Sequence, residues 1–100
     1  MVKFYRCNHC GNIVMMVHDS KVPMMCCGEK MTELVAGSTD AAVEKHVPVV
    51  DIKSNSVEVS VGSVMHPMEE EHYIMWIYLE TNRGGQIKYL NPGEDAMATF

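Results

Sequence analysis

Residues 66–79, His66-Pro-Met-Glu-Glu-Glu-His-Tyr-Ile-Met-Trp-Ile-Tyr-Leu79, combine a short charged loop with an apolar run. His66 and His72 lie six positions apart, whereas side chains that share one face of a helix lie three or four apart. In a bent loop, by contrast, two imidazoles with this spacing can point at the same place. The run from Tyr73 to Leu79 is apolar at successive positions, which predicts a central strand covered on both faces. The stretch therefore predicts a β-sheet protein with two histidines directly before a strand.

Further strand patterns surround this stretch on both sides. Val57, Val59 and Val61 alternate with Glu58 and Ser60, which is the period-two pattern of a half-buried strand. Other strand patterns occupy residues 47–53, 86–90 and 96–100, and turn residues at 82–85 and 91–93 separate the later ones. Strands this short, at such regular spacing, predict an all-β fold in which residues 37–100 form an antiparallel β-sandwich.

Residues 1–36 form a separate segment, which a small, polar linker at residues 35–42 joins to the predicted sandwich. Two short strands are expected within it, from Val2 to Tyr5 and from Ile13 to Val17. The segment has no window of helical periodicity. It is also too short to bury a sufficient core of its own, so we expect a metal to staple it.

All four cysteines fall within the first 27 residues. Two residues separate Cys7 from Cys10, which lets the backbone wrap round one metal with its N–H groups towards sulfur, and Gly11 relieves the crowding of that turn. Cys26 and Cys27 are adjacent, and neighbours in an extended chain point opposite ways, so the backbone must kink for both sulfurs to reach one metal. Zinc and iron both suit a tetrahedral four-thiolate site, and the spacing leaves the choice open.

Three of the five histidines, His46, His66 and His72, belong to the predicted sandwich. Neutral imidazoles are ligands for transition metals, and Pro48 and Pro67 stiffen the chain near these positions. We therefore predict a second metal site, at which the three imidazoles share one ion. The histidines at 9 and 18 are expected to be exposed loop residues.

Charged residues stand close to these histidines in the sequence. Glu44 and Lys45 directly precede His46. The carboxylate could close an open metal position, and the ammonium could attract a small anion into a protein whose overall charge repels anions. The three glutamates at 69–71 are expected to form a solvated face.

Composition excludes several classes of function. The chain has 100 residues, is 47% hydrophobic and 21% charged, and carries a formal net charge of -5. An acidic balance without a basic run argues against nucleic acid as a partner, and no apolar run approaches the roughly 18 residues of a membrane span. The first residues lack the apolar centre of a signal peptide, and clustered cysteines in a reducing compartment favour metal binding over disulfides. We expect a cytoplasmic protein.

Three motifs in this order resemble the desulfoferrodoxin family, the two-iron superoxide reductases. They are Cys7-x-x-Cys10 with Cys26-Cys27, then Glu44-Lys45-His46-Val47-Pro48, then His66-Pro67-Met68-x-x-x-His72-Tyr73-Ile74. The resemblance covers essentially the whole chain. It implies a desulforedoxin-like N-terminal module, in which four cysteines hold a rubredoxin-like iron. It also implies a neelaredoxin-like domain with an immunoglobulin-like β-sandwich, usually in a homodimer.

The resemblance further implies an activity. In the family, ferrous iron gives one electron to superoxide, and protonation releases hydrogen peroxide. By this resemblance, His46, His66 and His72 would be equatorial iron ligands. Lys45 would steer superoxide and help to protonate the peroxide, and Glu44 would occupy the open position in the oxidised resting state. The four-cysteine iron could relay electrons from a small donor protein such as rubredoxin.

The sequence departs from the family pattern in one respect. The family's catalytic iron also has an axial cysteine and a fourth histidine, from a Cys-x-x-His loop near the carboxyl terminus, but no cysteine follows Cys27 and no histidine follows His72. We therefore expect a member truncated at its carboxyl end, which lacks the last strand and the ligand loop. Such a site could take zinc in place of iron. The alternative function is a non-catalytic iron or zinc protein with an electron-transfer or structural role.

Overall fold

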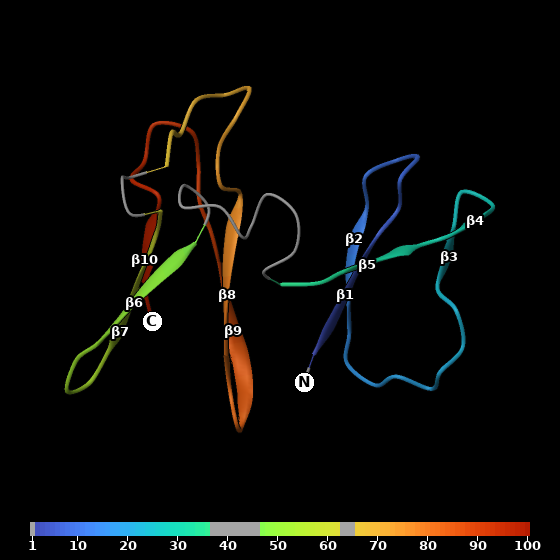
Figure 1. The fold of residues 1–100 in the computed structure, drawn as a ribbon, viewed down its shortest axis with the longest axis horizontal. Helices are drawn as coiled ribbons and strands as arrows, with labels where there is room; N and C mark the ends of the chain where they lie inside the picture. Colours follow the sequence, from blue (N-terminus) through green and yellow to red (C-terminus); the bar gives the residue numbers. More distant parts are fainter. Residues whose placement is uncertain (1, 37–46, 63–65) are drawn as a thin grey trace. The chain divides into compact units, whose positions relative to one another are not determined.

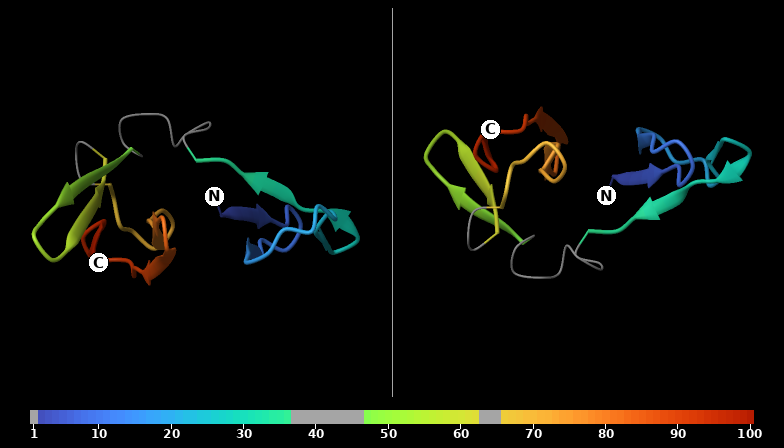
Figure 2. Two further views of the ribbon diagram at one scale, coloured as in Figure 1. Left: turned by 90° about the horizontal axis from the view of Figure 1, so that it is seen from below. Right: turned by 90° about the horizontal axis from the view of Figure 1, so that it is seen from above.

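The computed structural model describes residues 2–36, 47–62 and 66–100, and every regular element among them is a β-strand. The all-β fold expected from the sequence is therefore confirmed. The chain divides into two compact units, residues 1–36 and residues 37–100 (Figures 1 and 2).

The N-terminal unit contains two small sheets. Three strands form one sheet in the order β2-β1-β5, and all its neighbours are antiparallel (Figure 1). A short hairpin of β3 and β4 forms the other. The bounds are β1 Lys3–Arg6, β2 Ile13–Met16, β3 Met25–Cys26, β4 Glu29–Lys30 and β5 Thr32–Leu34. The two strands expected in this unit are present, each within one residue of its expected start.

Very little of this unit is buried. Among its described residues only Cys7 and Met31 are buried, with 2% and 5% of their surface exposed, while apolar side chains such as Val17 and Met25 are largely exposed. Two buried side chains are a very small core for a unit of this length, and units this short are usually stabilised by disulfides or a metal. The unit therefore depends on a cross-link between its loops.

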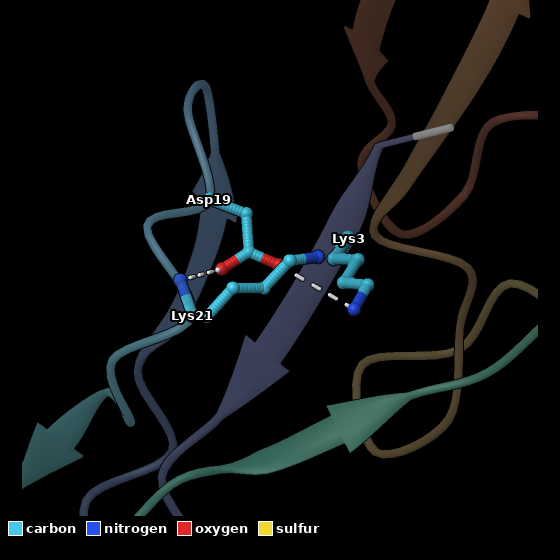
Figure 3. Close-up of polar contacts among 3 residues, drawn as sticks. All are labelled: Lys3, Asp19 and Lys21. Carbon is cyan, nitrogen blue, oxygen red and sulfur yellow. Dashed lines mark hydrogen bonds and ion pairs between the residues drawn. The ribbon is translucent and has the colours of Figure 1, made fainter.

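One polar cluster holds the connection between β2 and β3 (Figure 3). The Asp19 carboxylate accepts a hydrogen bond from the backbone N–H of Lys21 at 2.8 Å, which closes a turn around Ser20. The same carboxylate pairs with the ammonium groups of Lys3 on β1 at 3.4 Å and of Lys21 at 3.5 Å. The connection is thus tied back to β1, ahead of the segment that carries the second cysteine pair.

The second unit contains a three-stranded antiparallel sheet, in the order β10-β7-β6, and an antiparallel hairpin of β8 and β9. The bounds are β6 Pro48–Ile52, β7 Val57–Val61, β8 Trp76–Thr81, β9 Gly84–Tyr89 and β10 Met97–Thr99. The hairpin stands opposite the β6–β7 pair (Figure 2), and the space between holds the core. The buried cluster is Val59, Val61, Ile77, Ala96 and Ala98.

Most strand predictions for this unit are confirmed. Val59 and Val61 are buried as the alternating pattern requires, and Asn82 and Arg83 form the turn between paired Thr81 and Gly84. The prediction of a central strand from Tyr73 to Leu79 is wrong. The strand begins at Trp76, and among the described residues it pairs with β9 alone. Residues 73–75 instead leave the histidine loop in irregular backbone.

The described residues contain no helix that is long and apolar enough to cross a membrane.

We expect the pKa of the Asp19 carboxyl to lie below the usual aspartate value of about 3.9, chiefly because the Lys21 N–H donates to it. A lowered folded-state pKa stabilises the fold while the carboxylate is ionised, so this contribution is complete above about pH 4 and is lost as the pH falls through the folded-state pKa. Carbon-13 NMR titration of the zinc-loaded protein measures it. A Lys3→Met, Lys21→Met double variant should keep a lowered pKa, because the backbone donor remains. Return of the pKa to the usual value in that variant would assign the effect to the ammonium groups instead.

Candidate metal centres

The first cysteine pair lies in the tight loop between β1 and β2. The N–H of Cys7 donates to the carbonyl of Asn12 at 2.8 Å, and the N–H of Gly11 donates to the carbonyl of Cys7 at 2.9 Å. Within this loop the N–H of Cys10 points at the sulfur of Cys7, at 3.4 Å. Gly11 has a φ of +83°, a conformation that glycine adopts without steric cost. The loop thus shows both features that the sequence predicts, the N–H aimed at sulfur and the glycine turn.

The second pair lies on the β3–β4 hairpin, where Cys26 ends β3 and Cys27 opens the turn. Cys27 and Gly28 are the two turn residues, and both have positive φ, +53° and +74°. Positive φ at both central positions is the mark of a type I′ turn, the usual two-residue hairpin connection. This turn is the kink that adjacent cysteines require, and it costs about 1–2 kcal/mol at Cys27, because only glycine adopts this conformation freely.

The four sulfurs form one compact group. The Sγ atoms of Cys10 and Cys26 are 3.7 Å apart, those of Cys26 and Cys27 are 4.0 Å apart, and all four lie within 4.8 Å of one another. None of the four cysteines forms a disulfide. A regular tetrahedron with metal–sulfur bonds of about 2.3 Å has sulfur–sulfur edges of about 3.8 Å. The four cysteines therefore fit a tetrahedral metal ion such as zinc or iron.

The thiols of this group have different pKa values, so they lose their protons at different pH. The pKa of Cys7 is lowered to about 6, chiefly because the N–H of Cys10 donates to its sulfur. The pKa of Cys27 is raised to about 12, chiefly through its contact with the sulfur of Cys10, and that of Cys26 is raised through its contact with Cys7. Thiolates packed this closely repel one another unless a cation lies between them. A metal ion supplies that cation and releases protons as it binds.

Two asparagines support this group, and no sequence pattern predicts a role for either. The side-chain amide of Asn12 donates towards the sulfur of Cys26 at 3.9 Å. The side-chain amide of Asn8 donates to the hydroxyl of Thr32 at 2.8 Å, which joins the first loop to β5. Both are polar residues in a loop, where a role in solvation is the ordinary expectation, so only their position reveals the contacts.

The histidine region is built around a buried imidazole. His66 has 3% of its surface exposed, and its backbone N–H donates to the carbonyl of Val61, at the end of β7. Its Nδ1 lies 2.7 Å from the carbonyl oxygen of Pro67. A carbonyl only accepts, so the proton of the neutral ring is on Nδ1 and the lone pair is on Nε2, the form in which an imidazole binds a metal.

His72 is brought to His66 by a second tight turn. Glu69 and His72 exchange backbone hydrogen bonds of 3.1 and 3.0 Å, with Glu70 and Glu71 between them. The two imidazole ring centroids are 4.7 Å apart, and the rings are tilted by 47°. The bent loop thus brings together two imidazoles that are six positions apart in the sequence. The glutamates at 69–71 are exposed, as expected, and so are the histidines at 9 and 18.

The remaining predicted site residues, Glu44, Lys45 and His46, lie outside the described residues. The structure therefore describes two of the three histidines expected at the second site. It brings together all four cysteines expected at the first.

Comparisons with known proteins point in one direction. The family described as "Desulfoferrodoxin, N-terminal domain" matches residues 1–34, and the family described as "Desulfoferrodoxin" matches residues 38–100. A desulfoferrodoxin of Nitratidesulfovibrio vulgaris is 46% identical over 98 residues, which cover 98% of this chain and 78% of that protein. A desulfoferrodoxin homolog of Archaeoglobus fulgidus is 44% identical over 100 residues, which cover 100% and 80%. The crystal structure of the superoxide reductase from Treponema pallidum matches with a TM-score of 0.78 and 34% identity, over 100% of this chain and 78% of that one.

Replacement of Gly28 tests the turn that orients the second cysteine pair. A Cβ at Gly28 would meet no atom within 4 Å, so Gly28→Ala introduces backbone strain without a clash. We expect the strain of about 1–2 kcal/mol to lower zinc affinity about 5- to 30-fold, as measured by competition with a chromophoric chelator. Gly28→Asn is the matched control, because asparagine tolerates positive φ better, and it should retain most of the affinity. Equal loss of affinity in both variants would contradict the role assigned to the turn.

Proposed function

The chain belongs to the desulfoferrodoxin family, and from this premise we propose that it is a superoxide reductase. The reaction adds one electron and two protons to superoxide and releases hydrogen peroxide. The proposed catalytic site is the histidine centre, and the four-cysteine centre is a second, separate metal site. The likeness to a solved superoxide reductase over the whole chain supports this assignment.

The observation that carries the proposal is the pairing of His66 with His72. A buried imidazole whose Nδ1 proton is donated to a carbonyl has a fixed tautomer and ring direction, with its lone pair on Nε2, and this is the usual arrangement of a metal-binding histidine. A second imidazole lies 4.7 Å away, centroid to centroid. We propose that these two and His46 hold a non-haem iron. Ferrous iron held there would supply the electron.

The exposure of the two rings differs, and the difference suits a small substrate. His66 is buried against the sandwich, whereas His72 is exposed at the surface. A site between them would be anchored on its protein side and open on its solvent side.

The negative charge of the protein repels an anionic substrate such as superoxide. The chain carries a formal net charge of -5, and three exposed glutamates lie between the two histidines. We propose that Lys45 offsets this field locally, attracts superoxide, and donates a proton to the developing peroxide. Glu44 would close the open metal position when no substrate is bound.

The cysteine centre has a different role in this proposal. Four thiolates in a tetrahedron leave no open position for a substrate, so this site can store or pass an electron but cannot bind superoxide. We propose that it holds a rubredoxin-like iron and that a small electron-donor protein of the rubredoxin type reduces the chain. We also propose a cytoplasmic location, because free, clustered cysteines are typical of a reducing compartment. A homodimer is proposed from the family resemblance alone.

A second candidate function has its own support. Among the described residues, the four cysteines are the only group of three or more metal-binding side chains brought close together. A chain with only the cysteine site occupied would be an electron-transfer or structural metalloprotein, with iron or zinc bound.

Pulse radiolysis separates the two functions. We expect the pre-reduced, iron-loaded protein to consume superoxide in a second-order reaction. A His66→Ala, His72→Ala double variant should lose that reaction while it retains the metal on its cysteines. Reaction of the double variant at the wild-type rate would contradict the catalytic role of the histidine centre.

Replacement of Lys45 tests the role of charge. Lys45→Ala should lower the second-order rate constant about 10-fold at low salt and flatten its dependence on ionic strength, because the local attraction is lost. Lys53→Ala is the matched control. It removes the same charge from an exposed lysine that pairs with Asp51, and it should leave the salt dependence unchanged. Equal effects of the two variants would mean that overall charge, and not Lys45, governs the encounter.

A further inference from the structure

The loop that carries His66 and His72 is largely exposed, yet it must hold the two rings in place. Residues 69–72 are all exposed, and the hydrogen bonds between Glu69 and His72 fix only the shape of their own turn. They do not fix the turn relative to the sandwich. Met68 lies between the buried His66 and this turn, and it is half-buried against the core cluster.

Met68 makes three contacts that tie the loop to the sandwich. Its carbonyl oxygen accepts a hydrogen bond from the N–H of Gly93 at 2.7 Å, in the turn that precedes β10. Its thioether sulfur accepts a hydrogen bond from the N–H of Ile74 at 3.4 Å. Its side chain packs against the buried cluster, as does that of Ile74. Met68 precedes the turn and Ile74 follows His72, so the sulfur contact clamps the two ends of the loop together.

Core filling alone does not explain a methionine here. Leucine has a similar volume and would fill the same space. What the thioether adds is a sulfur lone pair, a weak acceptor, within reach of a half-buried backbone N–H. Without that acceptor the Ile74 N–H would lose its partner, and the chain after His72 would lose one of its fixed points.

We propose that Met68 is a positioning residue, whose thioether holds His66 and His72 at metal-binding separation by clamping the N–H of Ile74. The proposal rests on the proposed function, since it assigns Met68 to the histidine centre. The residue touches neither the metal nor the substrate, and it acts through the backbone on either side of His72. Loss of one hydrogen bond that orients the backbone beside a metal ligand is expected to lower metal affinity by up to about 10-fold.

The test compares Met68→Leu with Met97→Leu in the full chain, with zinc bound to the cysteines. Met97 is a half-buried methionine on β10, so its replacement makes the same chemical change outside the histidine loop. Three readouts are taken. They are hydrogen exchange of the Ile74 amide, nuclear Overhauser contacts between the two imidazole rings, and cobalt affinity of the histidine centre by absorption titration.

We expect Met68→Leu to speed exchange at Ile74 about 10-fold or more, and to weaken the contact between the imidazole rings. Met68→Leu should lower cobalt affinity about 10-fold, while its thermal midpoint stays close to that of wild type. For Met97→Leu, all three readouts should stay close to those of wild type. Unchanged exchange, or unchanged ring contacts despite faster exchange, would overturn the proposal. If wild type binds no cobalt at these histidines, the proposed function fails, but the ring contacts still decide whether Met68 positions them.

Discussion

Convergence of four sulfur atoms is the constraint on which the N-terminal unit depends. The described residues of that unit bury only two side chains, and one of them, Cys7, belongs to the sulfur group itself. Each backbone feature around the group serves the same end. A glycine turn follows Cys10, a two-residue turn with positive φ reorients Cys27, and the Asp19 cluster secures the connection between the two loops. A metal ion therefore takes the place of a hydrophobic core.

The second unit, unlike the first, has a hydrophobic core. Its small core of valine, isoleucine and alanine side chains supports the loop that carries His66 and His72. One imidazole of that loop is buried and has its proton fixed by a neighbouring carbonyl, while the other is held by a tight turn. The two units thus hold their candidate metal ligands by different means, a pair of tight hairpins in one and a loop packed on a sandwich in the other.

The sequence predicts those features that depend on local chemistry. The cysteine spacing, the kink at the adjacent pair, the alternation from Val57 to Val61 and the turn after Thr81 are all present in the structure. The failure lies at residues 73–79, where an apolar run was predicted to be a central strand. The first three of those residues lead out of the histidine loop in irregular backbone, and β8, which begins at Trp76, pairs with β9 alone among the described strands. Apolar composition does not reveal how many neighbours a strand has, and the Met68 contact joins atoms that no periodic pattern relates.

Occupation of the histidine centre is the point on which the whole account depends. Mössbauer spectroscopy of protein produced with isotopically enriched iron measures it directly. We expect two iron environments in wild type, one of four thiolates and one rich in nitrogen ligands. Only the four-thiolate environment should remain in the His66→Ala, His72→Ala double variant. A single four-thiolate environment in both proteins would contradict the account and leave this chain an electron-transfer or structural metalloprotein.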